Sequence, residues 1–153
     1  MKAVVVFGLA VAGVIASGAL WVRLAPLRPE HWHIVPAAEA STARPNEAQL
    51  LPGDGAPVYA LRPAELAARL DALALAEPRT ERLAGHPDDG FTTYVQRTPV
   101  WRFPDVISVH VLPHGEGATL AIWSRARYGY SDWGVNAARL ARWLEALKPF
   151  QQP

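Results

Sequence analysis

The chain has 153 residues, which fits one modest domain with a short additional segment, and a domain of this size buries roughly two-thirds of its unfolded surface. Its 15 basic and 14 acidic residues nearly balance and are scattered along the chain, which excludes the basic footprint of a nucleic-acid-binding protein. The absence of cysteine excludes disulfides, thiolate zinc sites, a lipoprotein anchor and cysteine nucleophiles.

The first element is apolar. Residues 3–22, AVVVFGLAVAGVIASGALWV, carry no charge, and a helix of this length, rising about 1.5 Å per residue, spans about 30 Å, the thickness of a bilayer's hydrocarbon core. We therefore expect residues 1–23 to form a single N-terminal transmembrane anchor. A cleavable signal sequence is the alternative, because residues 16–18 resemble a cleavage site, but 20 apolar residues exceed the roughly 7–15 usual for signal peptides.

Residues 24–57 contain six prolines and show little periodicity, so the backbone is repeatedly barred from helices and from strand ladders. We expect an extended, proline-rich tether here. Within it, His31 and His33 flank Trp32, and on an extended chain both imidazoles would lie on one side as half of a metal site. We favour a tryptophan at the membrane interface with polar neighbours, and we expect no metal and no cofactor.

The folded domain is expected over residues 58–153. Residues 58–61 are a short strand candidate, and Pro63 opens a helix that Glu77 and Pro78 end. Strands are predicted at residues 79–84, 91–98, 106–112 and 118–127 from their β-branched and aromatic residues and from their two-residue alternation, and a second amphipathic helix containing Leu140, Trp143, Leu144 and Leu147 ends at Pro149.

This order of elements predicts an α+β fold. Hairpin turns separate the strands, so we expect an antiparallel sheet of about four to five strands packed with two helices. A helix-grip arrangement, with a curved sheet wrapped on a long terminal helix, is one possible topology. In the last strand, Ser124 alternates with Arg125 and Arg127, and the arginine face should be solvated or paired.

The segment 127–136, RYGYSDWGVN, joins that strand to the second helix and allows two interpretations. As structure, Gly129 permits a tight turn and Ser131 or Asp132 caps the helix. As a site, Arg125, Arg127 and Arg139 beside a helix N-terminus would bind phosphate or carboxylate, although Asp132 would satisfy the same arginines internally. The structural interpretation is the stronger one.

Residues 103–105, FPD, and residues 123–136, WSRARYGYSDWGVN, resemble the bacterial and plastid family called domain of unknown function 1499 (DUF1499). The resemblance extends from about Val58 to Leu147, and Ala126 departs from it, since the family usually carries a serine there. The motif is met at these positions: Ser124, Arg127, Gly129, Asp132, Gly134, Asn136 and Arg139. Members of the family tend to be exported or membrane-associated, which implies a single-pass protein of the bacterial inner membrane with its C-terminal domain in the periplasm.

Motifs for catalysis are missing from the sequence: it has no nucleophile elbow, phosphate loop or zinc-protease motif. We therefore favour a non-catalytic interaction module, such as an accessory subunit of a larger membrane protein complex. The alternative is an exported binder of a small anionic ligand, or an enzyme. The candidate binding residues for a ligand or partner are Ser124, Arg125, Arg127, Asp132, Asn136 and Arg139.

Overall fold

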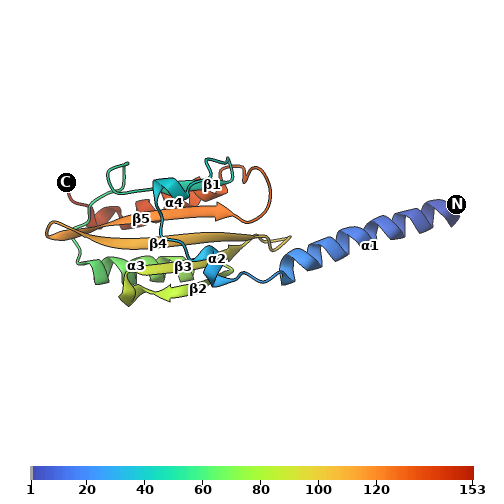
Figure 1. Ribbon diagram of the computed structural model, residues 1–153, viewed down its shortest axis with the longest axis horizontal. Coiled ribbons are helices and arrows are strands. Elements are labelled where there is room, and N and C mark those ends of the chain that lie inside the picture. Colours follow the sequence, from blue (N-terminus) through green and yellow to red (C-terminus); the bar gives the residue numbers. More distant parts are fainter. Residues whose placement is uncertain (1) are drawn as a thin grey trace.

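The computed structural model describes residues 2–153, and Met1, the first residue of the predicted anchor range, lies outside the described part. Helix α1 (Lys2–Leu24) projects from one end of the domain, with the C-terminus at the other end (Figure 1). Its stretch Val4–Leu24 has a mean hydropathy of 2.2 and is 0% buried. This helix is long and apolar enough to cross a bilayer, a property that signal sequences share.

The domain is built on one five-stranded antiparallel sheet with the strand order β1-β5-β4-β3-β2. The strands are β1 (Glu47–Leu50), β2 (Thr80–His86), β3 (Phe91–Arg97), β4 (Pro104–His114) and β5 (Gly117–Ala126). The long β4–β5 hairpin lies at the centre, with Asp105 opposite Ala126 at one end and His114 opposite Gly117 at the other. The predicted α+β fold with an antiparallel sheet is confirmed.

Two helices, α3 (Pro63–Ala76) and α4 (Val135–Leu147), pack on the same face of the sheet. Pro63 supplies the preset φ of a first helical turn, as the sequence predicts, and the Glu65 carboxylate caps α3 by accepting the Arg62 backbone N–H at 3.2 Å. The core between helices and sheet includes Leu66, Leu70, Tyr94, Ile107, Val109, Leu120, Ile122, Leu140, Trp143 and Leu147. Two helices therefore share the face that a helix-grip fold gives to one long helix.

The opposite face of the sheet is covered by residues 25–46, which we call the strap. It contains the short helix α2 (Pro29–Trp32) and a 3₁₀ turn, η1 (Ala38–Ala40). The His33 ring stacks on Phe91 with centroids 3.9 Å apart, and His33 Nδ1 lies 2.8 Å from Thr93 Oγ1. Segments far apart in the sequence thus enclose the sheet on both sides.

The structure places an edge strand within the range predicted as tether, because Glu47–Leu50 pair with β5 as β1. Residues 58–61 do not form a strand; Tyr59 makes isolated bridges to Ala118 and Gln151 instead. Pro57 and Pro63 lack the N–H that a longer ladder would need on either side of Tyr59. The 3₁₀ turns η2 (Pro87–Asp89) and η3 (Lys148–Phe150) complete the fold.

Candidate ligand-binding cleft

The candidate residues of the 124–139 segment lie on both sides of the sheet. Consecutive residues of a strand point to opposite faces, so Ser124 faces the helices while Arg125 faces the strap. Asn136 and Arg139 reach Ser124 from α4, whereas Arg127 turns toward the end of α1. The structure therefore does not bring Arg125, Arg127 and Arg139 together in one anion pocket.

Arg139 is the centre of a buried polar network on the helix side, and it is only 1% exposed. Its guanidinium donates to Asp105 Oδ2 at 2.8 Å, to Gln96 Oε1 at 2.8 Å and to Ser124 Oγ at 2.7 Å. Asn136 Oδ1 accepts from Arg139 and, at 2.6 Å, from Ser124. This network fixes the first turns of α4 to strands β3, β4 and β5.

Burial raises the pKa of Asp105, and the ion pair with Arg139 opposes that rise. Both partners are removed from water, because Asp105 is 5% exposed and Arg139 is 1% exposed. A buried charge is tolerated only when it is paired and hydrogen-bonded. The charge of Arg139 is therefore already neutralised within the domain.

Asp132 organises the turn before α4. Its carboxylate accepts the backbone N–H groups of Gly134 at 2.9 Å and Asn136 at 2.7 Å, which are amides that a helix start leaves unpaired. The Asn136 side chain donates to Asp132 and to the carbonyl of Asn46. Asp132 thus supplies an acceptor for the start of α4, although the N-cap position itself is Gly134, and Asn136 ties the turn to the end of the strap.

Arg125 holds the strap. Its guanidinium donates to the Trp32 carbonyl at 2.7 Å and lies 3.7 Å from the centroid of the Trp123 ring. Burial lowers the pKa of Arg125 to about 10, which the charge of Glu47 partly offsets. The arginine face of β5 is thus paired, with the strap as its partner.

Arg127 lies beyond the end of β5 and donates to the carbonyls of Ala25 at 3.0 Å and Pro26 at 3.1 Å. These carbonyls directly follow α1, so the contact fixes the domain at the end of that helix. Arg125 and Arg127 also line a hollow of about 270 Å³ beneath the strap.

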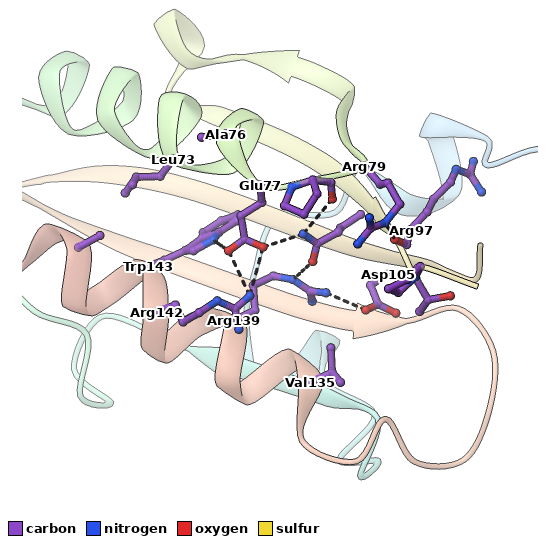
Figure 2. A pocket seen from close by; sticks show the side chains of 15 residues that line it. Leu73, Ala76, Glu77, Arg79, Arg97, Asp105, Val135, Arg139, Arg142 and Trp143 are labelled. Carbon is purple, nitrogen blue, oxygen red and sulfur yellow. Dashed lines mark hydrogen bonds and ion pairs between the residues drawn. The ribbon is translucent and has the colours of Figure 1, made fainter. Parts of the chain in front are cut away.

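A larger cleft of about 650 Å³ opens between α3 and α4 over the end of β3 and the start of β4, and Figure 2 shows the side chains around it. Its apolar side chains include Leu73, Val135 and Trp143, and its charged lining consists of Glu77, Arg79, Arg97, Asp105, Arg139 and Arg142. Four guanidiniums against two carboxylates leave the cleft positive. Of the six predicted binding residues, Arg139 is the one that lines it.

Glu77 is the hydrogen-bonding centre of the cleft wall. It accepts from Gln96 Nε2 at 2.6 Å, from Trp143 Nε1 at 2.8 Å and from Arg142 Nη2 at 3.1 Å (Figure 2). Partial burial raises the pKa of Glu77, but these donors outweigh the burial and hold the pKa below its usual value. Gln96 also accepts from Arg139, so the wall and the buried network form one continuous system.

The sequence did not identify Glu77, Gln96, Arg97 or Arg142 as site residues, because they come from different elements and no local spacing links them. The signal that pointed toward the cleft is the FPD motif at residues 103–105, whose aspartate pairs with Arg139. Among the described residues, 2–153, there is no group of three or more acidic or histidine side chains placed to hold a metal ion.

The architecture is that of an apolar N-terminal helix followed by an α+β domain with a positively charged cleft. A family model described as "Protein of unknown function (DUF1499)" matches residues 38–147, from the strap to the end of α4. The chain therefore belongs to the DUF1499 family, as its motifs predict. No curated protein matches the chain.

Proposed function

We propose that this protein is a single-pass, membrane-anchored binding module whose cleft between α3 and α4 takes an anionic amphipathic ligand, one with a carboxylate or phosphate head and a hydrocarbon body. In this proposal α1 is retained in the bacterial inner membrane and the domain lies on the periplasmic side. Supporting retention, Arg127 bonds the two carbonyls that follow α1, and Trp101 and Phe103 line a groove together with Ile15, Gly18, Ala19 and Val22 of that helix.

The lining of the cleft carries this proposal. Small-molecule sites are concave, largely apolar and supplied with a few oriented polar groups, and volumes of roughly 300–1,000 Å³ are typical. The Leu73, Val135 and Trp143 side chains offer such an apolar lining. The Arg142 side chain is 56% exposed and Arg79 is exposed as well, so guanidinium donors remain accessible for an anionic head.

A binding role suits the two carboxylates better than catalysis does. A general acid or base has to reach the substrate proton directly or through one water molecule. Glu77 already accepts from three side chains and Asp105 is paired with buried Arg139, so both serve to hold the surrounding donors in place. These two carboxylates therefore help to form a preorganised lining of the cleft.

Photo-crosslinking tests the proposal. The full-length protein, reconstituted in lipid vesicles, is irradiated with a diazirine-bearing fatty acid or, separately, a diazirine-bearing phosphatidic acid, and adducts are mapped by peptide mass spectrometry. We expect adducts on the peptides carrying Leu73, Val135 or Trp143. Labelling by only one of the two probes distinguishes a free carboxylate from a phospholipid headgroup as the anionic source.

Arg142→Gln should reduce the cleft adducts several-fold, whereas Arg44→Gln, an exposed arginine on the strap, should leave them unchanged. Adducts spread evenly over the domain, or cleft adducts insensitive to Arg142→Gln, contradict the proposal. A mild-detergent pull-down from native membranes addresses the other hypothesis, an accessory subunit. Stoichiometric recovery of a protein subunit that shields the cleft from both probes would favour that role over a lipid ligand.

A further inference from the structure

Large apolar side chains gather at the end of the domain nearest α1. Five of the eight exposed large hydrophobic residues outside α1 lie in the two loops 98–103 and 127–135, and these five are Val100, Trp101, Tyr130, Trp133 and Val135. Trp133 is 94% exposed and Tyr130 is 80% exposed. A concentration of aromatic surface on one end of a folded domain marks a site of interaction.

Both loops lie beside the C-terminal part of α1. The Arg23 guanidinium donates to the Val100 carbonyl at 2.8 Å, and the rings of Trp21 and Tyr128 lie 6.2 Å apart. Figure 1 shows the β3–β4 and β5–α4 connections at the end of the domain from which α1 projects. The two loops that carry the exposed aromatic residues therefore flank the point where the chain leaves α1.

Trp101 extends this contact along the helix. The groove that it lines reaches Ile15, nine residues before Leu24, and a helix rises about 13 Å over that distance. If residues 3–22 fill the hydrocarbon core, Val22 lies where lipid headgroups meet acyl chains and Ile15 lies about 10 Å deeper, so the loop enters the leaflet next to the domain. At that depth the surface that surrounds the loop is lipid.

We propose that loops 98–103 and 127–135 form a lipid-docking face, which seats the domain on the outer surface of the bilayer that α1 spans. This inference rests on the retained anchor of the proposed function and is independent of the cleft's ligand. Tryptophan and tyrosine are the residues enriched at bilayer interfaces, because one end of the ring is apolar and the other polar. Arg23 and Arg102 stand beside them and suit anionic headgroups.

The backbone conformation of Trp133 supports contact between its indole and the bilayer. Trp133 has a φ of 57°, in the left-handed region that bulky residues rarely adopt. The Ser131 hydroxyl accepts the Trp133 N–H at 3.2 Å and holds this turn. A strained residue whose side chain is almost fully exposed gains nothing from packing within the domain, and a bilayer supplies the missing apolar partner.

The docking face also determines where the cleft lies relative to the bilayer. Thr98, Pro99 and Val135 belong to these loops and line the end of the cleft nearest α1. A docked domain therefore holds that end of the cleft at the membrane surface. An amphipathic ligand drawn from the bilayer would have a short path into it.

Site-directed spin labelling tests the docking face. Because the sequence contains no cysteine, each introduced cysteine is the single site of labelling. Full-length Val100→Cys and Trp133→Cys variants are labelled with a nitroxide, reconstituted in vesicles containing phosphatidylglycerol, and exposed to oxygen or a water-soluble nickel chelate. We expect an oxygen-to-nickel accessibility ratio several-fold higher at both positions than at Leu75→Cys, an exposed apolar control on α3. Equal ratios at all three positions overturn the proposal.

Because the cysteine variant removes the indole, a second measurement keeps the native residue. Quenching of tryptophan fluorescence by brominated lipid should fall in Trp133→Phe and persist in Trp123→Phe, whose indole is buried beneath the strap, away from the cleft. Protein that an alkaline wash releases from the vesicles would refute the anchor and docking together. Protein that stays in the vesicles with water-accessible loops would refute docking alone.

Discussion

Removing Arg139 should cost much of the stability of the domain. The Arg139→Met variant keeps most of the side-chain volume but leaves Asp105, 5% exposed, without its partner. Breaking a buried ion pair by deleting one partner costs about 3–5 kcal/mol. Gln96 and Ser124 also lose a donor each, so we expect a loss of about 4 kcal/mol, within that range.

Urea unfolding of the full-length protein in mild detergent, followed by tryptophan fluorescence, measures this loss. With a denaturant slope of about 2 kcal/mol per molar, a loss of about 4 kcal/mol lowers the unfolding midpoint by about 2 M. The matched control is Arg142→Met, one helical turn further along α4, whose side chain is 56% exposed and pairs with Glu77. That change should cost less than about 1 kcal/mol, as exposed ion pairs do.

The double variant Arg139→Met with Asp105→Leu separates a lost ion pair from lost packing. Because no buried charge is then left unpaired, the double variant should be more stable than Arg139→Met alone. If Arg139→Met unfolds at the same urea concentration as Arg142→Met, or if the double variant is the least stable of the set, the ion pair does not hold α4 on the sheet.

Two further changes test other parts of the fold. The hydrogen bond from Arg82 lowers the pKa of Asp71, and the Tyr94 hydroxyl adds to this effect, while burial opposes it. Near pH 4 the folded state therefore holds fewer protons than the unfolded chain. The stability that this carboxylate contributes is present above about pH 4 and is lost as the pH falls below it. Asp71→Asn should flatten that acid loss when urea midpoints at pH of about 6 and about 3 are compared, and an unchanged slope would exclude Asp71 as a contributor. Arg125→Met should free the strap, so that limited proteolysis cuts near Trp32 several-fold faster than in wild-type protein while the β4–β5 hairpin stays protected; equal cutting rates would show that the strap is held by other contacts.

The helices and the central strands were predictable because their signals are local. Pro63 marks the start of α3 by its preset φ, and the two-residue alternation in residues 106–112 predicts β4, although the strap also buries the face that alternation leaves to solvent. By contrast, the sequence EAQL of β1 contains no β-branched or aromatic residue. It forms a strand because β5 offers an edge, with Glu47 opposite Arg125, and such pairing depends on tertiary contacts.

The candidate site was harder to predict from the sequence, because two signals disagreed. The residue types indicated one shared site, whereas the alternation along the strand indicated two opposite faces. Arginine side chains close together in sequence suggested one anion pocket. The two-residue period already placed Ser124 and Arg125 on opposite faces, and the structure gives each face its own partners. The cleft could not be predicted from the sequence for another reason. Glu77, Gln96 and Arg142 come from separate elements that only the folded chain brings together.

The segment RYGYSDWGVN contacts three parts of the molecule, which are the end of α1, the strap and α4. Its first residue, Arg127, bonds the carbonyls that follow α1, and its last, Asn136, joins the network under α4. Between them, the Gly129 carbonyl accepts from Asn46, which fixes the end of the strap to the same turn. One short turn therefore sets the position of the cleft relative to α1. A turn with this role must be rigid, and the two bonds that Asp132 accepts from the start of α4 supply that rigidity.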